Sequence, residues 1–436
     1  MKPVKVGLVG LGTVGSSVFN LLISNRTELE RRLGRTIDVV HVGARRDNPV
    51  CNLSAVRVSR HVLDVALDPD VDVVVELIGG TTVAKEIILT AIAQGKHVVT
   101  ANKALIAQHG QEIFAAATEK GVGVYFEAAV AGGIPVIKAL REGLSGNRID
   151  WLVGIINGTG NFILSKMRNE GAAFAEVLKQ AQALGYAEAD PTFDVEGIDA
   201  AHKLAILASV AYGIPLQFDK TFTEGISQIE IDDINYAQQF GYRIKHLGIS
   251  RRTVQGIELR VHPTLIPERC PIANIDGVMN GVLIHANAVG PTLYSGAGAG
   301  GNATASAVIA DLVDVARSLD VSAANRMPPL GFQSAAMSDA PVLAMDEVET
   351  AYYLRLTAED HPGVLADITR ILSSRGISIE ALLQKEVSDP AHDLVPIVLL
   401  TQRIKEKEMN AAIAEIEALD SIASKVVRIR LERLDA

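Results

Sequence analysis

Cysteine is scarce in this chain of 436 residues, which contains two, Cys51 and Cys270. Two cysteines cannot build a disulfide framework or a structural zinc site, and they favour a reducing, cytoplasmic location. Long hydrophobic runs are also missing, because the longest candidate, 204–214, is about half of the roughly 20 residues that a membrane span needs. With 41 basic and 51 acidic residues, the net charge is −10 and no basic stripe is available, which argues against nucleic-acid binding.

The composition is that of a globular protein with ample core, since 48 % of the residues are hydrophobic and 21 % are charged. At roughly 150 residues per domain, the length allows about three domains. In the first, 1–130, short apolar runs alternate with helical stretches, and this alternation predicts an α/β fold with a doubly wound parallel sheet of the Rossmann type. The expected strands are 4–9, 37–42, 71–77, 97–100 and 123–127, and the expected helices include 82–94 and 104–120.

The rest of the chain divides into parts of different character. A second, α+β domain is expected over 131–303, and a helix over about 304–320 is expected to return to the first domain. The stretch 321–349 is rich in proline, glycine and serine without periodicity, which is typical of a linker. Residues 350–436 follow a strand-helix-strand-strand-helix-strand order, which predicts a ferredoxin-like domain.

A glycine motif, Gly10-Leu11-Gly12-Thr13-Val14-Gly15, follows the first strand and begins the first helix. Gly10 permits the tight turn, Gly12 leaves room for a pyrophosphate, and Gly15 lets the helix pack against the sheet. The spacing alone is weak evidence, and a glycine-rich turn in another α/β protein is the alternative. Its place between strand and helix favours dinucleotide binding, with phosphates held by the backbone N–H groups of the helix N-terminus.

The end of the second strand bears on the choice of dinucleotide. NAD-preferring folds usually place an acidic residue there to bind the ribose 2′-hydroxyl group. This chain has Arg45 and Arg46, whose guanidinium groups suit a 2′-phosphate, so NADP is favoured. Asp47 follows directly and leaves NAD open, and a solvated charge cluster is the alternative.

Two lysines are candidates for chemistry. Lys103 follows the fourth strand at Thr100, and the carboxyl ends of parallel strands are where ligands bind, although a surface lysine would look the same. The stretch 185–203 carries five carboxylates, and its Asp199 and Lys203 share one helix face. A lysine beside an aspartate in a cleft can donate a proton to a carbonyl oxygen, but an ordinary helical ion pair is the commoner explanation. The preceding carboxylates could bind the ammonium group of an amino-acid substrate.

Two further loops can approach a ligand closely. In the last domain, Asp360, His361, Gly363 and Val364 join a strand to a helix whose N-terminus can hold a carboxylate, unless the loop is a structural turn. The glycine-rich stretch that includes Gly301 has no standard phosphate-loop form, but it also permits close backbone contact.

Taken together, these motifs resemble the homoserine dehydrogenase family over nearly the whole chain. The last 85 or so residues resemble an ACT domain, a small amino-acid-sensing module. Because the chain starts at the dinucleotide fold rather than behind an aspartate kinase, it resembles the monofunctional members. The stretches that carry the resemblance are 10–15, 76–80, 100–105, 127–135, 157–159, 185–191, 199–203 and 296–304.

The resemblance implies the NAD(P)-dependent interconversion of L-homoserine and L-aspartate 4-semialdehyde, on the route to threonine, methionine and isoleucine. It implies that Lys203 donates the proton in reduction and that Lys103 is a second catalytic or cofactor-contacting lysine. It assigns Asp199, Glu188, Asp194 and Thr159 to the substrate site, and Thr100 and Gly301 to the cofactor site. A monovalent cation, usually sodium, maps to Glu127 and to the backbone carbonyls of Val130, Gly132 and Ile134.

The same resemblance makes 131–303 the catalytic and dimerisation domain and 350–436 the regulatory domain. L-threonine, as an end product, is the expected effector. ACT domains usually pair across chains, so a dimer or a tetramer is expected. Two rival interpretations remain at this point: another dehydrogenase with an ACT domain, such as phosphoglycerate or prephenate dehydrogenase, and a non-catalytic sensor of a dinucleotide and an amino acid.

Overall fold

The computed structural model describes residues 2–384 and 394–434. Its backbone contacts divide the chain into two compact units, each assembled from three separate stretches of sequence. Unit 1 comprises the residues up to Gly158, Asp199–Thr221 and Val278–Ala340, and unit 2 comprises Thr159–Ile198, Phe222–Gly277 and the residues from Pro341 onward. Within the described ranges, no helix combines the length and the apolar character that membrane crossing requires.

Unit 1 contains a parallel six-stranded sheet with the order β3-β2-β1-β4-β5-β6. The order reverses direction between β1 and β4, and in such sheets ligands bind at this switch point, beyond the carboxyl ends of the strands. The strand bounds are β1 Val4–Val9, β2 Ile37–Gly43, β3 Arg57–Ser59, β4 Val73–Glu76, β5 His97–Thr100 and β6 Val124–Tyr125.

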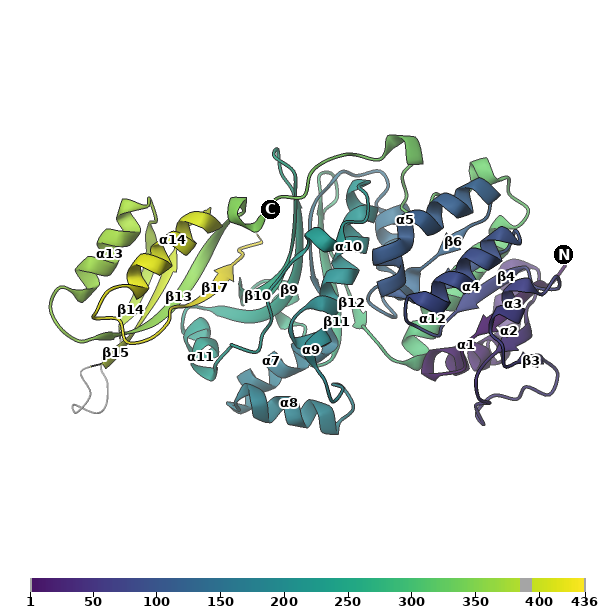
Figure 1. Cartoon of the computed structure of the whole chain (residues 1–436), viewed down its shortest axis with the longest axis horizontal. Helices are drawn as coiled ribbons and strands as arrows, with labels where there is room; N and C mark the ends of the chain where they lie inside the picture. The colour runs from purple at the N-terminus through teal and green to yellow at the C-terminus, as the bar shows by residue number, and fades with distance from the viewer. Residues whose placement is uncertain (1, 385–393, 435–436) are drawn as a thin grey trace. The chain divides into compact units, whose positions relative to one another are not determined.

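Helices cover both faces of this sheet (Figure 1). Helices α1, α2 and α12 pack together on one face, and α3, α4 and α5 pack together on the other. Asn102 caps the start of α5 by accepting a hydrogen bond from Leu105 N, and Gly121 ends the helix in a left-handed conformation. The helix bounds are α1 Thr13–Ser24, α2 Arg26–Leu33, α3 Leu63–Leu67, α4 Thr82–Ala93, α5 Lys103–Lys120 and α12 Gly301–Ser318.

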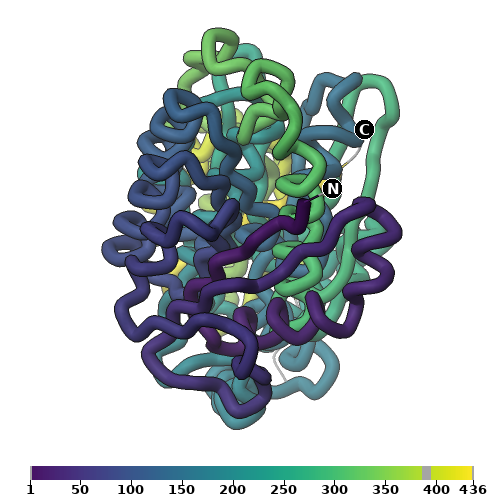
Figure 2. The backbone as a smooth tube through the Cα atoms, turned by 90° about the vertical axis from the view of Figure 1, so that its right-hand side faces the viewer, coloured from purple at the N-terminus to yellow at the C-terminus, as the bar shows by residue number. Residues whose placement is uncertain are grey.

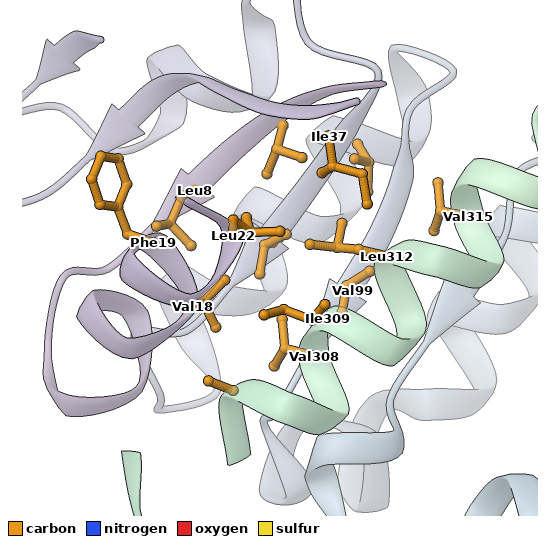
Figure 3. Close-up of a cluster of buried hydrophobic side chains, with 14 of the residues drawn as sticks. Leu8, Val18, Phe19, Leu22, Ile37, Val99, Val308, Ile309, Leu312 and Val315 are labelled. Carbon is orange, nitrogen blue, oxygen red and sulfur yellow. The ribbon is translucent and has the colours of Figure 1, made fainter. Parts of the chain in front are cut away.

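Helix α12 comes from far along the sequence yet completes the core of this sheet. Figure 2 shows its green segment beside the purple N-terminal segment, in agreement with the contact between α1 and α12. Leu312 and Val308 of α12 are fully buried with Val18 of α1 and Leu8 of β1 (Figure 3). Burial of this many aliphatic side chains, at about 1.5–3 kcal/mol for each, makes α12 an integral part of the fold.

The α/β fold class predicted from the sequence is confirmed, and within the parallel sheet and its helices the differences lie in short elements. The pattern missed β3, α2 and α3, which have three to eight residues each and leave little periodicity to detect. The expected strand at 123–127 ends at Tyr125, because Glu127 begins a 3₁₀ turn, η1 Glu127–Ala129. The helix expected from about 304 begins at Gly301.

The remainder of unit 1 is an antiparallel group of strands with the order β12-β11-β7, together with the buried helix α10. All residues of α10 from Asp199 to Tyr212 are buried, so its polar groups must find partners inside the protein. The bounds of these and the shorter elements are α6 Val136–Lys138, η2 Ala139–Gly143, β7 Ile149–Ile155, α10 Ile198–Tyr212, η3 Phe218–Lys220, β11 Met279–Ala286, β12 Gly290–Ala297, η5 Ala323–Asn325 and η6 Ser334–Ala336.

Unit 2 contains the ferredoxin-like domain that the sequence predicted. Strands β13, β14, β15 and β17 form its antiparallel sheet in the order β17-β13-β15-β14, and α13 and α14 pack together. The bounds are β13 Glu349–Glu359, α13 Val364–Ser374, β14 Ile379–Gln384, β15 Leu394–Thr401, β16 Ile404–Lys405, α14 Glu406–Glu417 and β17 Val427–Leu431.

This ferredoxin-like sheet continues directly into two long strands of the middle region. Strand β17 pairs in parallel with β10, and β10 pairs with β9 along its whole length. Glu432, one residue beyond β17, pairs with Arg260 of β10 and Arg251 of β9. The other elements of unit 2 are α7 Gly158–Glu170, α8 Phe174–Ala183, α9 Thr192–Val195, β8 Phe222–Thr223, α11 Ile231–Gln239, β9 Tyr242–Arg252, β10 Ile257–Pro267, η4 Pro271–Asn274 and η7 Met345–Glu347.

Candidate active site

A buried cluster of charged groups in unit 1 is built around Asp199, in the first turn of α10. Lys203, one helical turn later, donates hydrogen bonds from Nζ to Asp199 Oδ2 and to Ile156 O, each at 2.7 Å. Asn157 Nδ2 donates to the same Asp199 oxygen at 2.9 Å. The i, i+4 spacing seen in the sequence therefore places Asp199 and Lys203 on one face of α10. Ile156 and Asn157, which follow β7 directly, complete the cluster.

A second lysine reaches the same carboxylate. Lys103, the first residue of α5, forms an ion pair with Asp199 Oδ1. The side chains of Asp199 and Lys203 are 4 % and 11 % exposed, whereas that of Lys103 is 34 % exposed. Although burial disfavours an ionised carboxyl group, the two ammonium groups more than compensate and hold the pKa of Asp199 well below its usual range.

This cluster can perform acid chemistry on a bound carbonyl group. Asp199 remains ionised at neutral pH, so both ammonium groups are held by a fixed negative charge. An ammonium group in a water-poor site stabilises negative charge that develops on a nearby oxygen and can donate a proton to it. The arrangement is therefore more than a surface ion pair between helical neighbours, which was the commoner explanation of the sequence pattern.

Glu76 organises the carboxyl edge of the parallel sheet, and the sequence reasoning did not single it out as a site residue. It is fully buried at the end of β4 and accepts hydrogen bonds from Ile78 N and Gly79 N at 2.9 and 3.1 Å. Thr100 Oγ1, at the end of β5, donates to Glu76 Oε2 at 2.6 Å. The available signal was a carboxylate at the end of an otherwise apolar strand, which requires a buried partner.

The hydroxyl group of Thr100, a predicted cofactor residue, also helps to hold the loops after β4 and β5. Its hydroxyl oxygen also accepts from Asn102 N at 3.0 Å, and Asn102 Nδ2 donates to Gly80 O at 2.6 Å. These bonds connect the loops after β4 and β5 and fix the residue before Lys103. The structure therefore assigns to Thr100 a role in positioning the start of α5.

The glycine motif has the geometry that dinucleotide binding requires. Gly10 has φ 101°, a left-handed conformation, and a Cβ atom at position 15 would lie 2.0 Å from the Gly10 carbonyl oxygen. A Cβ atom on Gly12 would meet nothing within 4 Å, so this position faces open space. Gly12 precedes α1 without a side-chain cap, which leaves N–H groups of the first turn available to phosphate oxygens.

The predicted Gly301 lies against the same turn from α12. A Cβ atom there would lie 2.6 Å from Ser17 Oγ and 3.1 Å from Thr13 O. The absence of a side chain thus allows the N-terminal ends of α1 and α12 to approach closely.

A groove of about 880 Å³ runs from the glycine turn along the end of β2. Arg45 and Arg46 line it and are exposed, so their guanidinium groups are accessible to a ligand. Asp47, the residue that left NAD open, is paired with Arg60, whose Nη2 contacts both carboxylate oxygens at 2.9 and 3.0 Å. Arg60 was missed because its partner is 13 residues away in the sequence. The lining residues include Gly10, Leu11, Gly12, Gly43, Ala44, Leu77, Gly79, Gly80 and Thr82.

The acidic segment, residues 185–197, belongs to unit 2. Glu188 is exposed, Asp194 is half-buried in α9, and Thr159 is buried at the start of α7. Thr159 Oγ1 donates to Tyr186 O at 2.6 Å, so the start of α7 holds the start of the acidic segment. Gln182 Nε2 donates to Glu188 O at 3.0 Å and leaves the carboxylate of Glu188 exposed.

The loop proposed for a cation follows η1 in unit 1. Ala131 and Gly132 have φ of 55° and 52°, so the chain makes a left-handed turn between the carbonyls of Val130 and Ile134. Both carboxylate oxygens of Glu127 accept backbone N–H groups, of Ile137 and Lys138, at 2.9 and 2.8 Å. Glu127 can therefore bind a cation directly only through carboxylate oxygens that already accept backbone N–H groups of α6.

Two buried carboxyl groups meet beside this loop. Glu127 N donates to Asp311 Oδ2 at 2.8 Å. Burial raises the pKa of Glu127 to about 7, and burial together with the neighbouring Glu127 raises that of Asp311 to about 8. No cluster of three or more His, Cys, Asp or Glu residues with metal-binding geometry occurs in the described ranges, so a cation here would depend on carbonyl oxygens, which suit hard cations.

The effector loop predicted from the sequence joins β13 to α13. Gly363 has φ 108° and precedes α13 without a side-chain cap, and Val364 is buried as the first residue of the helix. His361 Nε2 lies 3.1 Å from Glu359 Oε2, and Gln384 Nε2 donates to Asp360 Oδ1 at 3.4 Å. The helix N-terminus is therefore open to a ligand carboxylate.

Comparison with known families decides between the interpretations left open by the sequence. Residues 10–127 match the family "Homoserine dehydrogenase, NAD binding domain", residues 135–313 match "Homoserine dehydrogenase", and residues 352–420 match "ACT domain". The chain belongs to the homoserine dehydrogenase family. It is accordingly an oxidoreductase that acts on a CH–OH group, with an NAD(P)-binding domain and a C-terminal ACT domain.

Two members of the homoserine dehydrogenase family align over the full length or nearly so, and a third aligns over 73 % of the chain. The chain is 62 % identical to a homoserine dehydrogenase of Pseudomonas aeruginosa over 435 residues, covering 100 % of both chains. The crystal structure of a homoserine dehydrogenase from Thiobacillus denitrificans matches with a TM-score of 0.94 and 60 % identity over 99 % of each chain. A hyperthermophilic archaeal homoserine dehydrogenase in complex with NADPH matches 73 % of this chain and 98 % of its own, with a TM-score of 0.62 and 26 % identity.

Proposed function

We propose that this enzyme interconverts L-homoserine and L-aspartate 4-semialdehyde in the cytoplasm, on the route to threonine, methionine and isoleucine, and that Lys203 is its proton donor. The observation that carries the proposal is the buried cluster of Lys203, Asp199 and Lys103 in the same unit as the glycine turn. The dinucleotide supplies the hydride acceptor or donor. The protein residues hold the substrate and donate a proton to it or accept one from it.

In the direction of reduction, negative charge develops on the aldehyde oxygen. Lys203, held by Asp199 and by Ile156 O, stabilises this charge and donates a proton to the oxygen. In oxidation the same amine accepts the proton of the substrate hydroxyl group. Lys103 shares Asp199 and is more exposed, which suits contact with substrate or cofactor.

The α-ammonium group of the substrate needs a negative partner. Glu188 and Asp194 are the carboxylates that we assign to it, with Thr159 as a polar neighbour. Fixing the ammonium end determines which carbon faces the hydride, and such positioning contributes to rate by lowering the entropic cost of the reaction. The exposed carboxylate of Glu188 supports this assignment.

NADP is the proposed cofactor. Arg45 and Arg46 line the groove beyond β2. Arg60 pairs with Asp47, whose carboxylate would otherwise be available to bind the ribose 2′-hydroxyl group of NAD. The archaeal family member in complex with NADPH supports the same assignment.

A monovalent cation, which we propose to be sodium, would be held mainly by the carbonyls of Val130, Gly132 and Ile134. The donor set fits because it consists of oxygens in a turn with two consecutive left-handed residues, next to the buried acids Glu127 and Asp311. Such an ion would stabilise this turn and take no part in hydride transfer.

L-threonine is the proposed effector, bound at the open N-terminus of α13 by Asp360, His361, Gly363 and Val364. Inhibition requires that threonine bind the active and inactive states with different affinities. The assembly is proposed to be at least a dimer, since ACT domains usually pair across chains.

Replacing Lys203 by alanine is expected to lower kcat about 10²- to 10⁴-fold while NADP still binds, because the proton donor is lost and the groove is untouched. The measurement is homoserine-dependent reduction of NADP followed by absorbance, with cofactor affinity from fluorescence titration. Lys166→Ala is the matched control, since Lys166 also pairs with a glutamate four residues away on a helix. Near-normal turnover in Lys203→Ala would remove this residue from proton transfer.

The cofactor assignment predicts that NADP binds more tightly than NAD. In the double variant Arg45→Ala/Arg46→Ala, the KM for NADP should rise on the order of tenfold or more, because charge-assisted contacts to the 2′-phosphate are lost, while the KM for NAD should change little. Arg31→Ala, on the exposed side of α2, is the control. Tighter binding of NAD by the unaltered enzyme would contradict the assignment.

The cation assignment predicts higher activity in sodium than in tetramethylammonium buffer of equal ionic strength. The bulky ion cannot enter a turn of carbonyl oxygens, and titration with sodium chloride should restore kcat. Thermal unfolding in the two buffers gives a second measurement, with a higher Tm expected in sodium. Equal activity and equal Tm in both buffers would refute the assignment.

The effector assignment predicts that L-threonine inhibits the enzyme and that Asp360→Ala reduces this sensitivity without changing kcat in its absence. Asp420→Ala, on the same domain, is the matched control. Light scattering on the same samples measures the oligomeric state. A point variant is preferable to removal of the domain, because β17 pairs with β10. Equal inhibition of all three proteins would exclude this loop as the threonine site.

A further inference from the structure

Arg430 of β17 is fully buried and contacts two parts of unit 2 at once. Within the ACT domain, its guanidinium donates two hydrogen bonds to Glu406, the first residue of α14. Toward the middle region, it donates to Glu224 Oε2 at 3.1 Å, and its guanidinium carbon lies 4.9 Å from the centre of the Phe222 ring. One side chain thus connects the last ACT strand to the short stretch that includes β8.

Glu224 is held on its other side by the long strands β9 and β10. Its backbone N–H donates to Val261 O at 2.8 Å, and its carbonyl oxygen accepts from His246 Nε2 at 3.0 Å. Arg428 of β17 adds a second contact to the Glu224 carboxylate, at 3.2 Å. Glu224 therefore has a fixed backbone and a side chain that faces two arginines of β17.

The residues that follow Glu224 directly contact the acidic segment. Ile226 N donates to Val195 O at 2.9 Å. A Cβ atom on Gly225 would lie 2.1 Å from Glu196 Oε2 and 2.8 Å from Val195 O, so the end of the acidic segment fills the space above this glycine. Displacement of the 224–226 backbone must therefore displace the acidic segment.

We propose that Arg430 and Glu224 form a positioning pair through which strand β17 of the ACT domain sets the position of the acidic segment. The inference rests on the proposed function in one respect, namely that Glu188 and Asp194 in this segment bind the substrate ammonium group. Glu224 itself touches neither substrate nor cofactor. It acts by holding the backbone on which the acidic segment packs.

A buried arginine has to keep its anionic partners, because an unpaired charge in the interior is costly. Glu406 fixes Arg430 to the ACT domain, so Glu224 must follow the position of β17. The ACT domain is thereby connected, through Arg430 and Glu224, to the acidic segment that carries the proposed ammonium ligands.

The test uses the full-length enzyme and the variant Glu224→Gln, which keeps shape and removes charge. The KM for homoserine should rise about three- to tenfold, while kcat and the KM for NADP stay within about twofold, because only substrate positioning changes. Glu224→Asp, which keeps the charge, should recover part of the loss. Glu415→Gln is the matched control, since Glu415 pairs with Arg375 on the exposed surface of the ACT domain.

Amide hydrogen exchange provides a readout independent of turnover. Exchange in peptides covering 188–197 should become faster in Glu224→Gln and stay unchanged in α4. Gly225→Ala, which pushes on Val195 and Glu196 without altering charge, should raise the KM for homoserine in the same way and keeps the test decisive if Glu224→Gln folds poorly.

The outcomes separate this proposal from the proposed function. If Glu188→Gln raises the KM for homoserine but Glu224→Gln and Gly225→Ala do not, the positioning pair is refuted and the substrate assignment stands. If the variants lose thermal stability without any change in KM or in exchange of the acidic segment, the pair has a purely structural role and the proposal fails. Failure of Glu188→Gln to affect KM would instead overturn the assignment of the ammonium site.

Discussion

The carboxylate of Asp199 is the constraint on which the reactive part of unit 1 depends. It lies in a buried helix, yet it remains ionised because Lys203 and Lys103 both approach it. Without this negative charge, two ammonium groups would face each other in a poorly hydrated space and repel one another. The aspartate therefore determines where both lysines are held, and it links α10 to the start of α5.

Parallel strands explain why the other groups of this unit gather nearby. The carboxyl ends of β1, β2, β4 and β5 lie at one edge of the sheet, so the glycine turn, the arginine pair, Glu76 and Lys103 follow one another there. By accepting two backbone N–H groups and the Thr100 hydroxyl, Glu76 keeps the loops after β4 and β5 in one arrangement.

Features encoded by local pattern were predictable, and features that depend on distant partners were not. The alternation of the first 130 residues and the strand-helix order of the last domain gave the correct fold class, and the i, i+4 spacing gave the Asp199–Lys203 pair. Arg60 and Glu76 were not predicted as site residues because their partners, Asp47 and Thr100, are 13 and 24 residues away. The pairing of β10 with β17 has no local signal, since paired residues such as Thr264 and Arg430 are 166 residues apart in the sequence.

The parallel pairing of β10 with β17 has a consequence for biosynthesis. Unit 1 is complete once the ribosome has made residue 340, whereas the sheet of unit 2 lacks β17 until residue 431 has been made. During that interval the part of β10 that later pairs with β17 is available to neighbouring chains, and unpaired strand edges promote aggregation. Nascent chains that stall or terminate early should accordingly be the species most dependent on chaperones.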